Sequence, residues 1–387
     1  MKVLICTDFY KFNLGGVTTV VESLCAGLRH YGHEAKVLAM SENTKSSHKK
    51  DDYYLGSIPA YYAPDMRFSV KINDPLIEEL IEWKPDIIHV QSEASVLMMA
   101  KKIQKKCNVP LIMTSNTDYT YFLFGKMKNK PMIRKLSTMV GKVFYAPAFR
   151  IIVPSKKALD FSFLQPYKDR LIVVPNGIEL NKYQKTLSES EEKQLRETLG
   201  IPKNNKTLCV ISRLSKEKNI KELINFLPDL LKVRNDITYL IVGDGPARKE
   251  LEKQVRLSGL QSRVVFAGQQ PLEEVWRYLA LSDIFTSASL FEVHSMSYLE
   301  ALAGGLPLLC KNDKSLKGVL EHGVNGFIYN NRTEYVKYAL NLIGDDELRK
   351  RLGSASLIKA EDFTSEKFAE NVIKVYEDSI SKWRSEK

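Results

Sequence analysis

Residues 283–305 read DIFTSASLFEVHSMSYLEALAGG and place a strand-like run, a short loop and an apolar, helix-forming run in immediate succession. Glu292 lies in the loop, and Glu300 lies eight residues later, inside the helical run. A helix N-terminus gathers unpaired backbone N–H groups that attract phosphate, and carboxylates accept hydrogen bonds from the paired hydroxyls of sugars and ribose. The segment therefore predicts a nucleotide-sugar site. Two glutamates at this spacing also occur on ordinary solvated helix faces, so the rest of the chain must decide.

The length and composition indicate a soluble globular protein of two domains. The chain has 387 residues, of which 44% are hydrophobic and 27% are charged, and this is too long for one ordinary domain. No apolar run is long enough to span a bilayer, and the opening MKVLICTDFY has the pattern of a strand rather than of a secretory signal. We therefore expect a cytoplasmic protein.

The cysteines are scattered, odd in number and mostly inside apolar segments: Cys6, Cys25, Cys107, Cys209 and Cys310. None of them forms a Cys-x-x-Cys pair or a Cys/His spacing suited to a metal. This pattern is typical of buried free thiols in a reducing compartment, so we expect no structural zinc and no other metal site.

The positive charge is concentrated in the first half of the chain. The net charge is +11, and residues 1–180 carry 25 lysines and arginines against 17 acidic residues. Between Tyr119 and Leu159 there are nine basic residues and no acidic one. This asymmetry predicts an anionic partner for the first half.

Strand-like and helical segments alternate along the chain in two successive series. The first series includes VLICTDF, AKVLAM, DIIHVQ, PLIMTS, RIIVPS and RLIVVP, and the second includes TLCVISRL, TYLIVGDG, RVVFAG, DIFTSAS, LPLLCKN and GFIYN. Alternation of this kind predicts an α/β protein with two Rossmann-like, doubly wound parallel sheets. Two such units facing each other place a ligand cleft at the carboxyl ends of their strands. The predicted parts are a first domain (1–180), a linker region (181–206), a second domain (207–362) and a C-terminal helix (363–387).

Glycines occupy two of the strand-to-helix turns. Gly15 and Gly16 follow the first strand and precede a helix, where they allow a ligand phosphate to approach the backbone closely. In VGDGPARKELE, residues 242–252, Gly243 and Gly245 lie at a corresponding turn of the second series. Either pair is also compatible with an ordinary loop or turn.

Two basic side chains follow the first strand of the second series. They are Arg213 and Lys218 in ISRLSKEKNIKEL, residues 211–223. A guanidinium and an ammonium at this position can hold a pyrophosphate and neutralise the charge of a leaving group. The alternative is the solvated, charged start of a helix.

The chain resembles the glycosyltransferases of the GT-B fold in the order of its motifs. These are the double glycine, the Arg…Lys pair, the GDGP turn and the two glutamates. More narrowly, they resemble the retaining family 4 group, which uses nucleotide-diphospho-sugars, and the resemblance extends over nearly the whole chain. It implies an N-terminal acceptor domain and a C-terminal donor domain, with the last helix crossing back to the first domain. It also implies that neither a protein nucleophile nor a divalent metal nor another cofactor is required.

The resemblance implies a role for each motif in binding the donor. Arg213 and Lys218 would hold the pyrophosphate and assist its departure, Glu292 would bind hydroxyls of the donor sugar, and Glu300 would accept hydrogen bonds from the ribose. Gly16 would lie against the diphosphate and the donor sugar. The backbone from Val293 to Met296 would meet the phosphate. The implied donor-binding residues are Gly15, Gly16, Arg213, Lys218, Gly243, Glu292, Val293, His294, Ser295, Met296 and Glu300.

The segment MTSNTDYTYF, residues 113–122, departs from the family pattern. Many relatives carry a histidine here, and Asn116 stands in its place. An asparagine can donate and accept hydrogen bonds to a sugar hydroxyl but cannot exchange a proton near neutral pH. We therefore add Asn116 and its neighbour Asp118 to Arg213, Lys218 and Glu292 as candidate catalytic residues. His89, which follows another strand, is equally compatible with a structural role.

The acid-free stretch contains PMIRKLSTMVGKVFY, residues 131–145, which predicts a basic amphipathic helix. Such a helix is typical of a surface that meets anionic lipid, although its apolar face could instead pack on the sheet. No nucleic-acid-binding module is present. The apolar face would comprise Met132, Ile133, Leu136, Met139, Val140, Val143 and Phe144. The candidate membrane or acceptor residues are Lys126, Lys128, Lys130, Arg134, Lys135 and Lys142.

Within the family, residues 299–331 and 363–377 look most like bacterial diacylglycerol glucosyltransferases, which are monotopic enzymes. This likeness implies a hexosyltransferase that moves glucose from UDP-glucose to diacylglycerol or another membrane lipid at the inner face of the cell membrane. One alternative is a transferase of cell-wall or capsular polysaccharide synthesis. An alternative of another class is a non-catalytic GT-B partner subunit, which Asn116 favours and the complete donor motifs oppose. The sequence predicts nothing about the oligomeric state.

Overall fold

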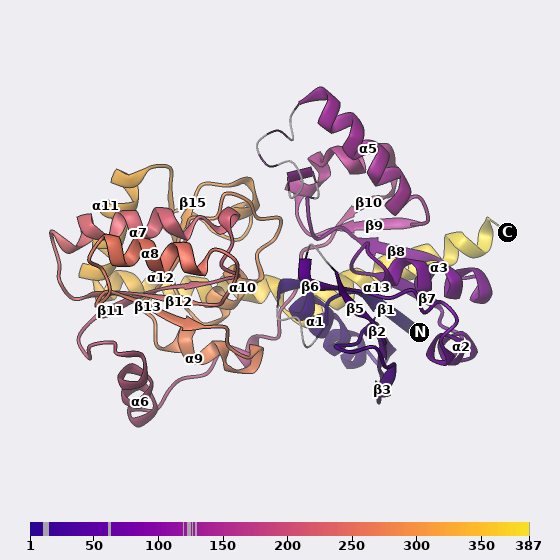
Figure 1. Cartoon of the computed structure of the whole chain (residues 1–387), viewed down its shortest axis with the longest axis horizontal. Helices are drawn as coiled ribbons and strands as arrows, with labels where there is room; N and C mark the ends of the chain where they lie inside the picture. Colours follow the sequence, from indigo (N-terminus) through magenta and orange to yellow (C-terminus); the bar gives the residue numbers. More distant parts are fainter. Residues whose placement is uncertain are drawn as a thin grey trace. The chain divides into compact units, whose positions relative to one another are not determined.

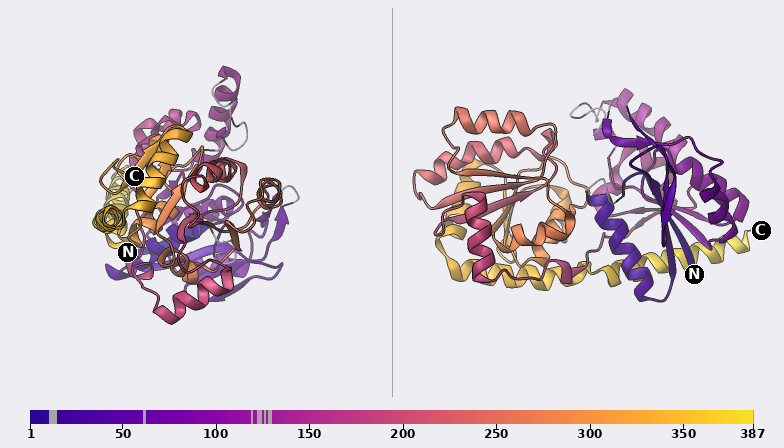
Figure 2. Two further views of the ribbon diagram at one scale, coloured as in Figure 1. Left: turned by 90° about the vertical axis from the view of Figure 1, so that its left-hand side faces the viewer. Right: turned by 60° about the horizontal axis from the view of Figure 1, so that its bottom comes forward.

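The computed structural model of the chain describes residues 1–10, 15–60, 63–118, 120, 121, 125, 127 and 130–386 (Figure 1). The chain forms two compact units. The first comprises Met1–Gly177 together with Ser365–Lys387, and the second comprises Ile178–Thr364. Each unit is an α/β structure with its own parallel sheet, and Figure 2 shows helices on both faces of these sheets. The predicted Rossmann-like, doubly wound architecture is therefore confirmed.

The first unit contains an eight-stranded sheet in the order β10-β9-β8-β7-β1-β2-β4-β3. All neighbouring strands are parallel except β3 and β4. A separate antiparallel pair is formed by β5 (Ile58–Ala60) and β6 (Ala63–Phe68). The strands of the large sheet are β1 (Lys2–Thr7), β2 (Glu34–Met40), β3 (Ser47–Lys49), β4 (Asp52–Leu55), β7 (Ile87–Val90), β8 (Leu111–Thr114), β9 (Arg150–Val153) and β10 (Leu171–Val173).

The central strands of this sheet consist almost entirely of aliphatic residues because helices cover both faces. In β1, for example, the run Val3–Cys6 is completely buried. The helices of the unit are α1 (Gly16–His30), α2 (Pro75–Glu82), α3 (Val96–Cys107), α5 (Pro131–Tyr145), the 3-10 helices η2 (Lys156–Asp160) and η3 (Ser162–Arg170), and α13 (Ser365–Ser385).

The C-terminal helix α13 belongs to the first unit and packs on α1. The two helices approach closely at Gly27, where an added Cβ would overlap the carbonyl oxygen of Ser365. Farther along α13, the hydroxyl of Tyr376 lies 2.6 Å from Nδ1 of His89 in β7, and Trp383 donates to the carbonyl oxygen of Asn108. The close contact at Gly27, one buried hydrogen bond and one exposed hydrogen bond therefore anchor the end of the chain to the first unit.

The second unit contains a six-stranded parallel sheet in the order β13-β12-β11-β14-β15-β16. Its direction of winding reverses between β11 and β14, and ligands of doubly wound sheets bind at the carboxyl ends of the strands beside such a reversal. The strands are β11 (Lys206–Ile211), β12 (Ile237–Val242), β13 (Val264–Gly268), β14 (Ile284–Ser287), β15 (Leu308–Lys311) and β16 (Gly326–Tyr329).

Helices cover this sheet on both sides: α7 packs with α8 and α11, and α10 packs with α12. The stretch 181–206, which we expected to be a linker region, contains part of η4 and all of α6 and lies within the second unit. The helices are α6 (Glu189–Leu199), α7 (Ile220–Leu231), α8 (Arg248–Leu257), α9 (Val275–Ala280), α10 (Met296–Ala303), α11 (Arg332–Gly344) and α12 (Asp346–Ala360). The 3-10 helices are η4 (Leu180–Lys182), η5 (Lys216–Lys218), η6 (Leu272–Glu274), η7 (Lys314–Leu316) and η8 (Glu361–Phe363).

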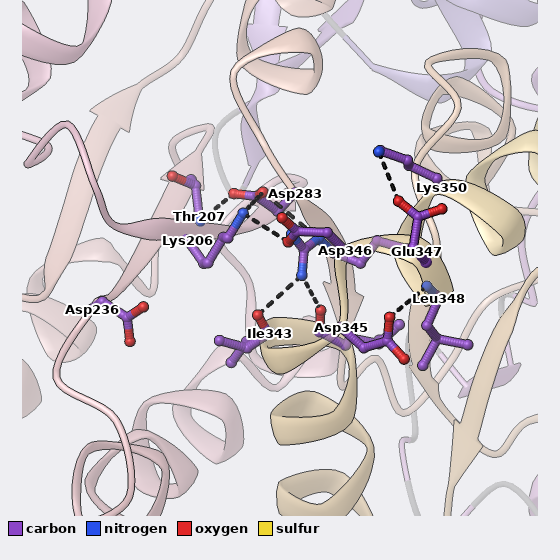
Figure 3. Close-up of polar contacts among 12 residues, drawn as sticks. Lys206, Thr207, Asp236, Asp283, Ile343, Asp345, Asp346, Glu347, Leu348 and Lys350 are labelled. Carbon is purple, nitrogen blue, oxygen red and sulfur yellow. Dashed lines mark hydrogen bonds and ion pairs between the residues drawn. The ribbon is translucent and has the colours of Figure 1, made fainter.

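A charge cluster ties the amino ends of β11 and β14 to α12 (Figure 3). Asp283 accepts a hydrogen bond from the backbone N–H of Thr207 at 2.8 Å, and it lies 3.4 Å from Nζ of Lys206. The same ammonium lies 3.2 Å from Asp346, at the start of α12. Opposite charges alternate within the cluster, so it stabilises the packing of α12 at the end of the sheet opposite the carboxyl ends of the strands.

Candidate functional site

The carboxyl ends of β11 and β14 lie side by side at the reversal of strand order, so the loops that follow them are neighbours. Backbone and side-chain hydrogen bonds join the two loops. Leu290 donates from its backbone N–H to the carbonyl oxygen of Glu217 at 2.8 Å, and Asn219 donates from Nδ2 to the carbonyl oxygen of Ala288 at 3.3 Å. The two predicted donor motifs therefore form one continuous surface.

Lys218 and Glu292 meet at this surface. The Nζ of Lys218 lies 2.6 Å from Oε1 of Glu292, and the two side chains are 23% and 10% exposed. A carboxylate withdrawn from water requires a hydrogen-bonding or charged partner, and Lys218 provides one. The sequence analysis selected both residues separately, and only the fold brings them into contact.

Arg213 lies in the loop that follows β11, and its side chain is exposed at the same edge of the sheet. The adjacent Ser212 was not selected from the sequence. Its hydroxyl is buried and has no hydrogen-bond partner among the residues that the structure describes. A serine directly after a strand is common, so the sequence alone carries no signal for it.

The glycines after β12 allow this loop to pack against the loop after β11. Gly243 has a φ of 131° and Gly245 a φ of 156°, which are left-handed conformations that favour glycine. A Cβ at Gly243 would overlap the carbonyl oxygen of Ser212, and a Cβ at Gly245 would lie 2.5 Å from that of Leu214. Both glycines are therefore required by the close approach of two loops at the site.

The N-terminus of α10 opens onto the same edge. Its N-cap is Ser295, whose hydroxyl lies 3.0 Å from that of Ser297 but does not cap a backbone N–H of the helix, and the first turn contains no acidic residue. Among the described residues, the N–H groups of this turn thus have no side-chain cap, and a helix end of this kind attracts anions. Val293, just before it, is buried.

His294 packs against Phe363, with a distance of 5.5 Å between the ring centroids. Burial lowers the pKa of His294 to about 4, so the ring is neutral near neutral pH. Its Nδ1 has no hydrogen-bond partner within the described part of the chain. The side chain therefore acts as a packing group beside the predicted phosphate-binding backbone.

Glu300 lies in α10 with its side chain turned into the protein. It is 6% exposed, and burial raises the pKa of this carboxyl group to about 7, while a hydrogen bond from Tyr183 opposes the increase. The hydroxyl of Tyr183 donates to Oε1 of Glu300 at 3.2 Å. The sequence analysis missed Tyr183, whose signal is only an aromatic residue in a polar segment.

In the first unit, Asn116 follows β8 and lies beside the segment that follows β7. Its Nδ2 donates to the carbonyl oxygen and to Oε1 of Gln91, at 3.2 Å each. Because a backbone carbonyl can only accept, this contact determines the orientation of the amide and directs Oδ1 of Asn116 away from Gln91.

Asp118 and His89 have structural contacts. Oδ1 of buried Asp118 accepts from the backbone N–H of Tyr121 at 3.1 Å, as in a local turn cap. His89 is completely buried, lies 2.6 Å from both Tyr376 and Thr114, and burial lowers its pKa to about 3. These contacts support a structural role for His89.

The double glycine lies at the start of α1. Gly16 is the first residue of the helix, and Gly15 is an extended N-cap without a side-chain cap. Residues 11–14, immediately before it, lie outside the described residues.

The predicted basic amphipathic helix is α5. Four of its seven predicted apolar-face residues are exposed, whereas Ile133 is buried and Val140 and Phe144 are half-buried. The helix packs on η3 with Ile133 and three buried residues outside the predicted face, which are Ser137, Gly141 and Tyr145. Lys130, Arg134, Lys135 and Lys142 are exposed, and Lys126 and Lys128 lie outside the described residues. The exposed fractions are 76% for Met132, 44% for Leu136, 59% for Met139 and 72% for Val143.

No helix in the described ranges is both long and apolar enough to cross a membrane. Within the same ranges, no three histidine, cysteine or acidic side chains are arranged to hold a metal ion.

Comparisons with known proteins agree with the motifs. The family model described as Glycosyl transferases group 1 matches residues 191–359, and the model described as Glycosyltransferase Family 4 matches residues 14–182. Among curated proteins, the alpha-monoglucosyldiacylglycerol synthase of Streptococcus pneumoniae is 28% identical over 98% of this chain and 86% of its own length. The corresponding synthase of Acholeplasma laidlawii is 26% identical over 99% and 98%.

Among solved structures, Anabaena HepE in complex with UDP-glucose superimposes with a TM-score of 0.76. Its sequence is 20% identical, and the match covers 98% of this chain and 100% of the HepE chain. This likeness establishes the fold, and the two family models span most of the chain between them. The chain therefore belongs to the family 4 glycosyltransferases of the GT-B fold.

Proposed function

We propose that this protein transfers glucose from UDP-glucose to diacylglycerol or another membrane lipid, with retention of the anomeric configuration and without a metal. The observation that carries the proposal is the Lys218–Glu292 pair at the reversal of strand order in the second sheet. The names of the two monoglucosyldiacylglycerol synthases support the sugar and the lipid. The UDP-glucose complex of a protein with the same fold makes UDP-glucose the donor to test.

In this proposal the second unit binds the donor. Arg213 and Lys218 carry the positive charge that a pyrophosphate needs, and the backbone of Val293–Met296 adds the N–H groups of a helix N-terminus. Negative charge develops on the phosphate as its bond to the sugar breaks, and these groups stabilise that charge. Glu292 binds hydroxyls of the sugar, and Glu300 binds the hydroxyls of the ribose.

The environments of the two glutamates support a reaction without a protein nucleophile. Glu292 is already paired with a lysine, and Glu300 is buried against Tyr183, so both are suited to accept hydrogen bonds from hydroxyls. The acceptor hydroxyl would attack the anomeric carbon on the face that the phosphate leaves. A phosphate oxygen of the leaving UDP would take the hydroxyl proton.

In this proposal the first unit binds the acceptor. Asn116 presents Oδ1 as an acceptor for a hydroxyl group, because Gln91 occupies its Nδ2. Gly16 would lie against the diphosphate and the donor sugar. Asp118 is the weaker candidate here, since its carboxylate accepts the backbone hydrogen bond of a local turn.

We also propose that α5 attaches the protein peripherally to the inner face of the cell membrane. Its exposed apolar residues recur at positions 132, 136, 139 and 143, which follow one side of a helix. The exposed basic residues of the same helix suit the headgroups of anionic lipid. An apolar side exposed to this extent is unusual for a surface that meets only water.

The donor proposal is tested by isothermal titration of the purified protein with UDP and UDP-glucose. Absence of nucleotide binding would contradict it and would favour the non-catalytic partner subunit. The acceptor is tested by incubating UDP-glucose with diacylglycerol or with oligosaccharides and analysing the products by mass spectrometry. Glucosyldiacylglycerol is the expected product, whereas transfer to oligosaccharides alone would identify a polysaccharide transferase.

A further inference from the structure

Tyr183 occupies a fixed position near the start of the second unit. The backbone N–H of Ile178, five residues earlier, donates to the carbonyl oxygen of Phe363 at 2.7 Å. The one-turn helix η4 follows, and Tyr183 closes it by donating its backbone N–H to the carbonyl oxygen of Leu180 at 2.9 Å. The side chain is only 4% exposed. The segment is therefore anchored at Ile178 and closed by a local turn, and burial holds the phenol ring in place.

The hydroxyl of this ring reaches the carboxylate of Glu300. The two residues are 117 positions apart, and the distance from the Tyr183 hydroxyl to Oε1 of Glu300 is 3.2 Å. A hydrogen bond from a neutral donor to a carboxylate is short-ranged and directional, so it restricts the rotation of the carboxyl group. It uses one of the acceptor positions on Oε1. The other positions on the two oxygens remain suited to a pair of adjacent hydroxyls.

The environment gives this hydrogen bond a second effect. Burial raises the pKa of Glu300 to about 7, and the hydrogen bond from Tyr183 acts in the opposite direction, toward the ionised form. An ionised carboxylate accepts two hydroxyl groups, whereas a protonated one must use one oxygen as a donor. The contact with Tyr183 thus favours the protonation state that a vicinal diol requires.

We propose that Tyr183 is a positioning residue for the nucleotide, whose hydroxyl holds the Glu300 carboxylate in the orientation that accepts the 2′- and 3′-hydroxyls of ribose. This role rests on the proposed function, because it requires that Glu300 binds the ribose of the donor. It adds a residue outside the recognised motifs and assigns recognition of the ribose diol to a pair of side chains rather than to Glu300 alone.

The experiment compares the affinities of the full-length protein for UDP and for 2′-deoxy-UDP, measured by titration calorimetry. The wild-type protein should bind the deoxynucleotide more weakly by a factor of about 10 to 100, since a hydrogen bond to a charged group is lost. In Tyr183→Phe the ratio should fall to within about threefold, because the carboxylate is no longer held. The KM for UDP-glucose should rise with little change in kcat.

Tyr239→Phe is the matched control. Tyr239 is buried in the core of the same unit, and its hydroxyl lies 2.8 Å from that of Tyr335. This variant also loses one buried hydroxyl, so it should lower stability to a similar degree and leave the ratio of the two affinities unchanged. A change that appeared equally in both variants would identify a general loss of packing and overturn the role of Tyr183.

The outcomes separate this inference from the proposed function. If the wild-type protein binds neither nucleotide, both are wrong. If it distinguishes UDP from 2′-deoxy-UDP and Tyr183→Phe does so equally well, only the role of Tyr183 is wrong. Should Tyr183→Phe fail to fold, the same two affinities are measured in Glu300→Gln. An unchanged ratio of the affinities in that variant overturns the inference, because Tyr183 is proposed to act through the Glu300 carboxylate.

Discussion

Lys218 donates from Nζ to Oε1 of Glu292 across 2.6 Å, although the two residues are 74 positions apart in the chain. They meet because β11 and β14 are neighbouring strands at the reversal of strand order. This pair joins the two loops that carry the donor motifs. It consists of a lysine and a carboxylate that are both largely withdrawn from water.

Breaking the pair from one side should cost both stability and activity. Lys218→Met removes the ammonium that lies 2.6 Å from the carboxylate of Glu292 and should lower the free energy of unfolding by about 1–3 kcal/mol. Adding Glu292→Gln should restore most of that stability, because the negative charge that Lys218 balances is removed as well. Activity should remain at least about 100-fold reduced in both variants, since the phosphate loses a cation. Urea unfolding and initial rates with UDP-glucose measure the two quantities.

The control is Lys206→Met in the charge cluster at the opposite edge of the sheet (Figure 3). It should lower stability without a comparable loss of activity. Equal losses of activity in Lys206→Met and Lys218→Met would show that Lys218 acts only through folding.

Gly243→Ala should destabilise the second unit. The residue has a left-handed φ, and a Cβ would overlap the carbonyl oxygen of Ser212, so the loop after β11 must move. We expect a loss of more than about 3 kcal/mol, combining backbone strain with the displaced loop. Gly259→Ala is matched in its left-handed φ of 66° but has no neighbouring atom within 4 Å of the added Cβ. It should cost only about 1–2 kcal/mol, as thermal unfolding can measure.

The affinity for UDP should depend on the ionisation of Glu300. Burial raises the pKa of this group to about 7, so the ionised form, which the proposed contact with ribose requires, becomes depleted as the pH falls through that value. Affinity should therefore decrease by up to about tenfold for each pH unit below about 7. The Glu300→Gln variant should bind more weakly and lack this component, as titrations over the same pH range would reveal.

The raised pKa of Glu300 should also make the stability of the fold depend on pH, in the direction opposite to that of UDP affinity. The folded protein holds the Glu300 proton more tightly than the unfolded chain, so this group contributes most to stability below its ordinary pKa. That contribution should be lost as the pH rises through about 7 and should be absent from Glu300→Gln. A stability difference that grew with rising pH would contradict the assigned direction.

Membrane attachment should depend on the exposed apolar residues of α5. Replacing Met132 and Val143 by serine removes the two most exposed of them, at 76% and 72%. Losing this burial should weaken binding to vesicles by at least about 100-fold, because each of the two buried side chains contributes roughly 1.5–3 kcal/mol. Sedimentation with phosphatidylglycerol vesicles at low salt measures the effect.

Val233→Ser is the control for this surface, since Val233 is 66% exposed in the second unit and lies on no such stripe. The wild-type protein should bind vesicles of phosphatidylcholine less well than anionic ones. Failure of the wild-type protein to sediment with anionic vesicles would refute the proposed attachment.

Asn116→Ala should lower kcat/KM by about tenfold while leaving the affinity for UDP unchanged, because the proposed hydrogen bond from the acceptor hydroxyl to Oδ1 is lost. The orientation of the amide depends on Gln91, whose carbonyl oxygen accepts from Nδ2. A variant that retained full activity would exclude Asn116 from the reaction.

Much of the architecture could be predicted from local patterns. Aliphatic runs of four to seven residues separated by turns predicted the strands, because a parallel strand buried on both faces has little choice of residue type. The stripe on α5 was predicted as a single apolar face, but the fold divides it. Ile133 packs inward, while Met132, Leu136, Met139 and Val143 remain exposed. Helical periodicity identifies an apolar face, but it does not determine which part of that face another element covers.

The sequence by itself determined the fold class, and it predicted the donor motifs with Arg213, Lys218, Glu292 and Glu300, because each depends on neighbours close in the chain. The tertiary structure alone decided which of these residues meet. The order of the strands brings Lys218 to Glu292, and the anchored segment after Ile178 brings Tyr183 to Glu300. Contacts across 74 and 117 positions arise from strand order and packing, which no local spacing encodes.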